Sequence, residues 1–552
     1  MQQGFRKPYY KYSSSKKVQS NQSTKSNSSS QKTNIISQTG WTITQEYCNL
    51  LHEQQAVYLG QRGYTLLKSH LSPEDIQQIK KDLFKIPKNS LGKPNLDEGF
   101  PLYRENDKKI YVPRFYGLSR YGTPQRNELV EGEPISSSCQ FVGTLLPHQI
   151  EAIRVYTDHL AKNETTLKTG GILELPCGYG KTVLTIKIIA ELGGKTIILV
   201  HKEFLMNQWI ERIRQFMPNA RIGILQGNKC ELIDNDIVIG MIQSIYNKEF
   251  SSGIFDPFRL TVIDEVHRIG SSEFSKTLTK IPTKYMLGIS ATVERKDGLT
   301  DILYMYIGPK IHSIKRENDD FVLVRAIEYK SSDCDFNTVE YDYTGRIKHS
   351  TMISKLCSFG PRSDFIIKII RNLFEENPKK QMIVLCHNRC LLVYLHDILS
   401  KEVGENVPTV GYYVGGMKQS DLAISETKQV VLATYAMAAE ALDIKSLSTL
   451  LLMSPKTDII QSVGRILRTK HNNPLIVDLI DTHACFQNQW TKRRQYYKKC
   501  NYKIVKTFST EYPVGWRTLF EPSKGHEEED NEEVELGCVE SDPIYNIDSI
   551  VF

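Results

Sequence analysis

The chain has 552 residues, of which 40% are hydrophobic and 24% are charged. This length predicts two to four domains, and the composition is typical of a globular protein that buries sizeable cores. No stretch approaches the roughly 18 consecutive apolar residues of a membrane span, and residues 1–30 contain no apolar core of a secretory signal. The sequence therefore excludes the secreted and membrane-spanning classes, and we expect an intracellular protein with no membrane partner.

Charge is distributed unevenly along the chain. Residues 1–40 carry seven basic residues and no acidic one, whereas residues 521–552 carry eleven acidic residues against one lysine. The formal net charge is +7, so the part between these ends holds a larger positive excess than the whole. Such an excess is compatible with a polyanionic partner such as nucleic acid. Both ends lack a hydrophobic period, which predicts a disordered basic tail (1–40) and an acidic tail (521–552).

A small mixed accessory domain is expected over residues 41–135. Ser72 followed by Pro73 has the pattern of a helix start, and the helix is predicted to run to about Phe84. Two aromatic stretches, 100–103 and 110–116, flank a polar turn and predict a hairpin with interleaved basic residues. Its side chains either pack against the domain or stack nucleic-acid bases.

From about residue 140, short apolar runs alternate with helical segments. The first series comprises Gly171–Leu175, Thr196–Val200, Asp236–Gly240, Leu260–Asp264 and Tyr285–Ser290, and the second comprises Gln381–Cys386, Val410–Val414, Val430–Thr434, Thr449–Met453 and Leu475–Leu479. This alternation predicts an α/β fold with two tandem doubly wound parallel sheets. We expect the first domain at 136–310, a connection at 311–375 that leads into the second domain, and the rest of that domain at 376–520.

Cys386, His387 and Cys390 lie close together in the sequence, but Cys386 and His387 fall within an apolar strand pattern. No second pair of ligands follows, so core packing is favoured over a zinc site.

A glycine-bearing loop follows the first of these strands. Its residues are Pro176, Cys177, Gly178, Tyr179, Gly180, Lys181 and Thr182. In such a strand–loop–helix unit the backbone N–H groups and the lysine hold phosphates, and the threonine hydroxyl serves Mg²⁺. Leu175 stands where the strict phosphate-loop pattern has its first glycine. Downstream, a buried strand ends in Asp264 and Glu265, which predicts a metal ligand beside a residue that orients the attacking water.

These motifs resemble those of superfamily 2 helicases. The resemblance rests on four segments: Gly180-Lys181-Thr182, Asp264-Glu265-Val266-His267, Ser290-Ala291-Thr292 and the QxxGRxxR run Gln461–Arg468. The segments 287–298 and 440–444 are similar to the subgroup of the xeroderma pigmentosum group B ATPase, except that Ala441 replaces its usual glycine. The amino-terminal hairpin and the run from Trp490 to Tyr497 resemble helicases of nucleocytoplasmic large DNA viruses, including the poxvirus transcript-release helicase.

The resemblance implies two RecA-like domains, the cofactors ATP and Mg²⁺, and a role for each matching residue. Gln149 would read adenine, and residues 176–182 would hold the triphosphate. Asp264 would bind the metal and Glu265 would polarise water. The residues implied to couple the nucleotide to the nucleic acid are His267, Ser290 and Thr292. The catalytic residues implied on the second domain are Gln461, Arg465 and Arg468, of which the arginines would offset developing phosphate charge when the domains close.

Family members grip the sugar-phosphate backbone through both domains. The matching positions here are His201, Lys202, Arg389, Thr434, Glu440 and Asp443. Such a grip is independent of sequence and sensitive to salt. The basic, tyrosine-containing run 490–506 either extends this track or forms a closing helix docked on the second domain.

We therefore predict an ATP-dependent helicase or translocase of the DEVH-box type acting on DNA, with a role in viral transcription or DNA metabolism. An RNA helicase and a translocase that displaces a bound protein or transcript without unwinding remain open as alternatives. Transcription machinery is a candidate partner. A viral protein of this kind is expected in host cytoplasmic factories or in the virion.

Overall fold

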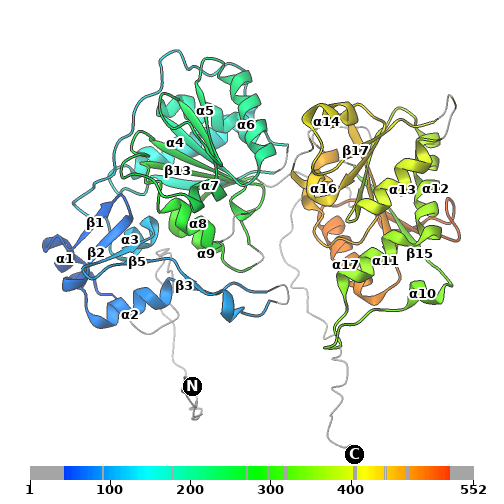
Figure 1. Ribbon diagram of the computed structural model, residues 1–552, viewed down its shortest axis with the longest axis horizontal. Coiled ribbons are helices and arrows are strands. Elements are labelled where there is room, and N and C mark those ends of the chain that lie inside the picture. The colour runs from blue at the N-terminus through cyan, green and yellow to red at the C-terminus, as the bar shows by residue number, and fades with distance from the viewer. Residues whose placement is uncertain are drawn as a thin grey trace, which may run out of the picture. The chain divides into compact units, whose positions relative to one another are not determined.

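The computed structural model describes residues 43–89, 92–176, 178–268, 271–295, 297–314, 321–401, 404, 407–440, 442, 444–467 and 473–522. The predicted basic and acidic tails lie outside these residues, apart from Glu521 and Pro522. Two eight-stranded sheets and one four-stranded sheet form the scaffold (Figure 1). In the part of the chain that is described, no helix combines the length and apolarity that crossing a membrane requires.

The four-stranded sheet lies near the amino terminus and is antiparallel throughout. Its order is β1 (Val57–Gly60), β2 (Gly63–Leu67), β6 (Lys109–Val112) and β5 (Arg104–Glu105). A short second pairing joins β3 (Phe84–Lys85) to β4 (Phe100–Pro101). The helices are α1 (Gln45–Glu53), α2 (Pro73–Asp82) and α3 (Arg114–Arg120).

The predicted helix after Ser72 is confirmed, because the Ser72 hydroxyl accepts a hydrogen bond from the backbone N–H of Asp75 at 3.1 Å. The predicted hairpin is wrong in two respects. Residues 100–101 pair with 84–85 instead of with 110–112, and the hairpin partner is β5. The second predicted strand also stops early, because Pro113 caps α3 and the chain is helical from Arg114.

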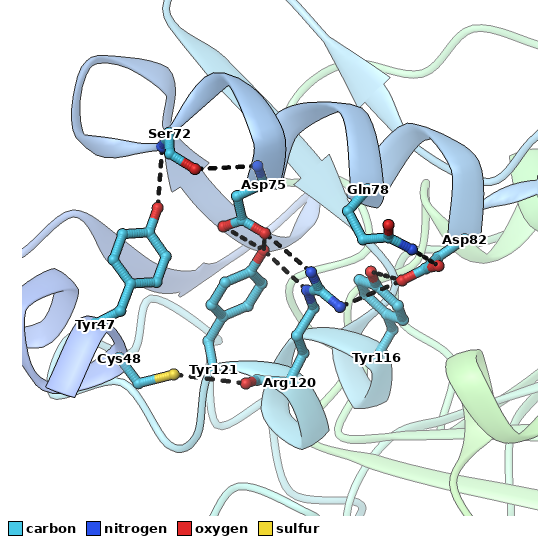
Figure 2. Close-up of polar contacts among 9 residues, drawn as sticks. All are labelled: Tyr47, Cys48, Ser72, Asp75, Gln78, Asp82, Tyr116, Arg120 and Tyr121. Atoms are coloured by element: carbon cyan, nitrogen blue, oxygen red, sulfur yellow. Dashed lines mark hydrogen bonds and ion pairs between the residues drawn. The ribbon is translucent and has the colours of Figure 1, made fainter. Parts of the chain in front are cut away.

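A buried polar network joins these three helices (Figure 2). Asp75 is fully buried, and Arg120 Nη2 and the Tyr121 hydroxyl each approach Asp75 Oδ1 to 3.0 Å. Arg120 Nη1 lies 3.3 Å from Asp82, which also accepts a hydrogen bond from the Tyr116 hydroxyl. Because burial of a charge is costly unless it is paired and hydrogen-bonded, this network specifies how α2 meets α3.

Arg114, the first residue of α3, links the amino-terminal domain to the chain beside the first eight-stranded sheet. Its side chain is 7% exposed and donates to the backbone carbonyls of Leu167 at 3.0 Å and Lys284 at 2.9 Å. It also donates to the Thr169 hydroxyl at 2.8 Å. Burial lowers the pKa of Arg114 to about 10, and carbonyl acceptors surround the charge in place of a carboxylate.

The first eight-stranded sheet is parallel except at one edge, where β10 is antiparallel to β9. Its order is β10 (Lys229–Cys230), β9 (Ile222–Gln226), β11 (Ile237–Met241), β8 (Thr196–Val200), β12 (Leu260–Asp264), β13 (Tyr285–Ser290), β7 (Gly170–Glu174) and β14 (Lys310–Ser313). The central strands are buried along their whole length, as expected for a sheet covered on both faces.

Helices cover both faces of this sheet (Figure 1). One face carries α4 (Pro147–Asn163), α5 (Lys181–Leu192) and α6 (Glu203–Phe216), whose apolar residues share one core with the strands. The other helices are α7 (Ile242–Asn247), α8 (Ser271–Leu278) and α9 (Thr300–Ile307), and a 3-10 turn covers Val266–Arg268.

The second eight-stranded sheet is parallel except for its last strand. Its order is β17 (Val410–Tyr413), β18 (Val430–Thr434), β16 (Gln381–Cys386), β19 (Leu447–Leu452), β20 (Leu475–Asp481), β15 (Leu323–Tyr329), β21 (Lys503–Phe508) and β22 (Arg517–Phe520). The two tandem RecA-like sheets are therefore confirmed, and all ten predicted strands overlap strands of the structure. The segment 311–375, predicted as a connection leading into the second domain, contributes the strand β15, which pairs with both β20 and β21.

Two cores lie on opposite faces of this second sheet. One is formed with α11 (His349–Ser358), α12 (Gly360–Glu376) and α13 (Arg389–Leu399). The other is formed with α14 (Gln419–Glu426), α15 (Tyr435–Glu440), α16 (Ile460–Ile466) and α17 (Ala484–Lys499). A short helix, α10 (Cys334–Asn337), follows β15.

The basic run from residue 490 onward forms most of α17 and is docked on the sheet. Trp490 and Tyr497 are buried, and Arg493 forms a two-pronged ion pair with Asp478 at 2.7 and 2.8 Å. Tyr502, just beyond the helix, is also buried. These rings are unavailable for stacking bases, so the closing-helix alternative holds for them.

Candidate functional site

Three neighbouring strands bring the sequence motifs to one edge of the first large sheet. The strands β12, β13 and β7 lie side by side and are parallel. In their register Asp264 pairs with Ile289, and Ser290 pairs with Glu174. The phosphate loop, the acidic pair and the Ser290 loop therefore leave the sheet at the same carboxyl edge, where open α/β sheets bind ligands.

The phosphate loop is set by two glycines in the left-handed region. Gly178 has φ of 87° and Gly180 has φ of 69°, and Gly180 is the N-cap of α5, which begins at Lys181. A Cβ on Gly180 would stand 2.2 Å from Gln149 Nε2, so a side chain here would displace the Gln149 amide and would be strained in this left-handed conformation. The first N–H groups of α5 thus face the loop and can receive an anion. Cys177 lies outside the described residues.

Gln149 holds this loop from α4. Its side chain is 4% exposed, and Oε1 accepts from the backbone N–H of Leu146 at 2.8 Å. Its Nε2 donates to the carbonyls of Tyr179 at 3.3 Å and Gly180 at 3.4 Å. His148 Nε2 also lies 3.2 Å from the Tyr179 carbonyl, a contact that no sequence pattern predicted. Gln149 thus braces the loop, and its contact with adenine stays a prediction.

Two neighbouring oxygens lie at long distances from Lys181 Nζ. Its Nζ lies 3.5 Å from the Leu175 carbonyl and 3.8 Å from Glu265 Oε1. A compact cation beside a helix N-terminus and a glycine-bearing loop fits the β- and γ-phosphates of a nucleoside triphosphate. Thr182 follows on the first turn of α5, partly exposed, where its hydroxyl can serve a metal ion.

Asp264 lies at the end of β12 and is 7% exposed. The indole Nε1 of Trp209, on α6, donates to Asp264 Oδ2 at 2.9 Å. Burial and the charge of the neighbouring Glu265 together raise the pKa of Asp264 to about 6, although Trp209 and Lys181 lower it. A buried carboxylate held by an indole, close to a lysine, fits a divalent cation, which would favour the ionised form.

A short series of polar contacts leads from the acidic pair to the next strand. Glu265 Oε2 lies 3.4 Å from His267 Nδ1, which lies 2.7 Å from the Ser290 hydroxyl. The Ser290 hydroxyl donates to the Thr292 carbonyl at 2.5 Å. The structure therefore brings together the three residues predicted to couple the two ligands, His267, Ser290 and Thr292.

Glu174 and Arg295 also belong to this edge, and the sequence pattern did not single them out as functional. Glu174 accepts from the backbone N–H of Val293 at 2.9 Å, and its other oxygen accepts from Lys310 and Ser313, each at 2.8 Å. Arg295 Nη1 lies 3.5 Å from the carbonyl of His267. Together they hold the chain that follows Thr292 against β7 and the acidic motif.

His201 and Lys202 follow directly after β8 and are partly exposed. They leave the same carboxyl edge as the phosphate loop, because β8 is parallel to its neighbour β12. Their contact with nucleic acid stays a prediction.

On the second large sheet, the predicted nucleic-acid residues also follow strand ends. Thr434 ends β18, and Arg389 begins α13 shortly after β16, the strand that pairs with β18. Arg389 is exposed. Glu440 is the last residue of α15, and Asp443 lies outside the described residues.

Gln461 and Arg465 lie on α16. Arg465 is 7% exposed, and its Nη1 donates to the Leu442 carbonyl at 2.6 Å. Arg468 lies outside the described residues. At the end of β16, Cys386 is buried and donates to the Asn388 carbonyl, as a core thiol does.

A phosphate loop, an acidic pair and a coupled serine on a RecA-like sheet, with a second such sheet downstream, define an enzyme that hydrolyses a nucleoside triphosphate. Comparison with known proteins gives the family. Residues 143–295 match the family model described as "Type III restriction enzyme, res subunit". A candidate ATP-dependent RNA helicase, L396 of Acanthamoeba polyphaga mimivirus, is 35% identical over 457 residues, which cover 81% of this chain and 86% of the relative.

Two further viral relatives are more distant. A candidate helicase, 161L of Invertebrate iridescent virus 6, is 26% identical over 79% of this chain and 98% of its own length. A candidate ATP-dependent RNA helicase, QP509L of African swine fever virus (isolate Tick/Malawi/Lil 20-1/1983), is 27% identical over 60% of this chain and 69% of its own length. The chain belongs to the superfamily 2 helicases, in the group carried by these large DNA viruses, and is an ATP-hydrolysing enzyme.

Proposed function

We propose that this enzyme is a motor that couples ATP hydrolysis to movement along, or unwinding of, DNA. The observation that carries the proposal is the series of contacts from Lys181 through Glu265 and His267 to Ser290. It joins the phosphate loop to the loop after β13 through contacts that are each shorter than 4 Å. A change at the γ-phosphate therefore has a short path to the part of the sheet edge that the family uses for nucleic acid.

ATP and Mg²⁺ are the proposed cofactors, since the residues present fit both. The residues proposed to hold the triphosphate are Pro176, Cys177, Gly178, Tyr179, Gly180, Lys181 and Thr182, with Gln149 bracing the loop. Thr182 and Asp264 would hold Mg²⁺, which supplies charge neutralisation at the phosphates. Glu265 is proposed to orient the water. Gln461, Arg465 and Arg468 are proposed to act on the phosphates from the second domain when the domains close.

The proposed nucleic-acid track uses the strand ends of both large sheets. His201 and Lys202 contribute from the first sheet, and Arg389 and Thr434 from the second. Glu440 and Asp443 are also proposed to contact nucleic acid, because they match positions that do so in the family. Contacts of this kind are made to the sugar-phosphate backbone, so binding is expected to weaken as salt rises, whatever the base sequence.

DNA is proposed because segments 287–298 and 440–444 are similar to a DNA-acting subgroup. An RNA substrate is the second candidate, and it is favoured by the names of the mimivirus and African swine fever virus relatives, which call them RNA helicases. A translocase that displaces a bound protein or a transcript is the third. The proposed setting is viral transcription or DNA metabolism, with transcription machinery as partner, in host cytoplasmic factories or in the virion.

The test is steady-state ATPase activity at fixed low salt, with no nucleic acid, single-stranded DNA, duplex DNA or RNA. Lys181→Ala is the control that should abolish turnover. Stimulation by DNA alone supports the proposal, and stimulation by RNA alone overturns the choice of substrate while leaving the motor intact. Strand displacement compared with protein displacement on a blunt duplex then separates unwinding from translocation. A wild-type enzyme that neither nucleic acid stimulates would contradict the proposal.

A further inference from the structure

A small hairpin stands between α10 and α11, and Figure 1 shows this connection extending away from the helices of its domain. Its base is fixed, because Val339 and Ile347 pack against the hydrophobic core formed with α11, α12 and α13. Two backbone hydrogen bonds close the arms: Lys348 N donates to Glu340 O at 2.9 Å, and Asp342 N donates to Arg346 O at 2.7 Å. The arms also form an antiparallel bridge between Tyr341 and Ile347.

The tip of the hairpin is a three-residue turn with defined geometry. Gly345 N donates to the Asp342 carbonyl at 3.0 Å, and Gly345 has φ of 76°. Asp342 Oδ1 accepts from Thr344 N at 2.8 Å, from the Thr344 hydroxyl at 2.6 Å and from Arg346 N at 2.9 Å. This is the three-residue hairpin loop with a glycine in the left-handed position, so its outermost residue is presented in a fixed direction.

That outermost residue is Tyr343, whose side chain is 101% exposed. Tyr341, one strand position before the turn, is 55% exposed. Single apolar side chains on a surface are common and need no explanation. Here, however, the ring stands on a turn whose backbone is ordered by a carboxylate and a glycine, so the backbone loses little conformational entropy when a ligand stacks on the ring.

The charges around the ring favour a polyanion. The hydrogen bond from Thr344 lowers the pKa of Asp342, whose carboxylate is directed into the turn. Glu340 faces Lys355 at 4.0 Å. Arg346 and Lys348 are exposed on the same arm, and among the described residues no ion pair is assigned to either. The exposed groups of the hairpin are therefore two aromatic rings, two cations and the half-exposed Glu340, whose charge Lys355 offsets.

We propose that Tyr343 stacks on a base of single-stranded nucleic acid while Arg346 and Lys348 contact the adjoining phosphates. Stacking on an aromatic ring accepts any base, and cations on one side of the ring suit the backbone of a single strand. The buried centre of a protein interface is more apolar than its surroundings, whereas the neighbours of Tyr343 in the turn are Thr344 and Gly345. The inference rests on the proposed function, because it places an extra contact on the track of the motor.

The test uses the full-length protein and short single strands of DNA and RNA that carry one 2-aminopurine. Fluorescence of that base reports stacking, and fluorescence anisotropy reports affinity. Tyr343→Ala is expected to weaken binding about tenfold and to remove the quenching, and Tyr343→Trp is expected to retain both. Asp342→Ala keeps the ring but loosens the turn, so an intermediate loss is expected. ATPase activity without nucleic acid should be the same in all variants.

Tyr394→Ala is the matched control. Tyr394 is 37% exposed on α13 of the same domain, and its hydroxyl donates to Asp364 at 2.5 Å. Equal affinity and quenching in the wild type and in Tyr343→Ala, with ATPase still stimulated, would overturn the stacking role and leave the proposed motor function intact. A wild-type protein that bound neither strand would overturn the proposed function as well.

Discussion

The indole of Trp209 supports the candidate metal ligand, and removing it offers a sharp test of the site. Trp209 is 1% exposed, and its Nε1 donates to Asp264 Oδ2 at 2.9 Å. Trp209→Phe keeps most of the apolar ring and deletes the donor. A hydrogen bond to a charged group contributes about 1.5–3 kcal/mol inside a protein. At 1.36 kcal/mol for each unit, its loss should raise the pKa of Asp264 by roughly one to two units.

The direction of the effect on activity follows from which form of Asp264 is needed. Burial already raises the pKa of this carboxyl to about 6, and only the ionised form can hold a cation. Activity that depends on Mg²⁺ should therefore fall as pH drops through this pKa. In Trp209→Phe the fall should begin at higher pH, so the variant should lose most activity near neutral pH and approach the wild type at alkaline pH.

The assay is ATPase activity across pH at several Mg²⁺ concentrations. Trp490→Phe is the control, since Trp490 is a buried tryptophan of α17, packed on the second sheet, that also loses packing on substitution. We expect the acid limb to shift only in Trp209→Phe and to move back as Mg²⁺ rises, because metal and proton compete. A pH profile of Trp209→Phe that coincides with the wild type, or one that drops equally at every pH, would refute the reasoning.

Three further predictions concern coupling and stability. Ser290→Ala removes the 2.7 Å contact with His267, so ATPase stimulated by nucleic acid should fall about fivefold while the basal rate is retained; equal loss of both rates would contradict this. Arg362→Met leaves Asp481 buried without its partner and should cost about 3–5 kcal/mol in urea unfolding, most of which Arg362→Met/Asp481→Leu should restore. Burial, with a contribution from Lys456, lowers the pKa of His387 to about 4. The neutral form of His387 therefore contributes stability that is fully present above pH 6.5 and is lost as pH falls toward 4. His387→Asn should remove this part of the pH dependence of the free energy of unfolding.

The sequence predicted the two sheets because buried parallel strands leave an unmistakable pattern. Continuous apolar runs such as Leu260–Asp264 and Gln381–Cys386 mark them directly. The strand β15 was not predicted because two charged residues, Arg325 and Glu328, interrupt its apolar run, one on each face of the strand. It also lies in a segment without recognised motifs. The hairpin near residue 110 was misjudged because Pro113 was included in a strand, although proline fixes φ and precedes the helix α3.

The polar partners in the site were harder to predict than its motifs. Motifs are local, so Lys181 and Asp264 could be identified from their neighbours in the sequence. Trp209 lies 55 positions before Asp264, and on α6 it has the periodicity of an ordinary core residue. Likewise, nothing near Gln149 in the sequence indicates that its amide holds the carbonyls of the phosphate loop. Both contacts depend on which helix packs beside which strand.

The docking of the basic helix α17 could have been predicted from the acidic residues of a neighbouring strand. Its cations and tyrosines fit a nucleic-acid track and a docked helix equally well when the helix is considered alone. The strand β20, however, contains Asp478 and Asp481 within a run that is otherwise apolar. Two carboxylates in a fully buried strand require cationic partners, since an unpaired buried charge is too costly. Arg493 of α17 pairs with Asp478, and Arg362 of α12 pairs with Asp481. The buried Asp478 therefore requires that the part of α17 with Arg493 faces the core and not the solvent.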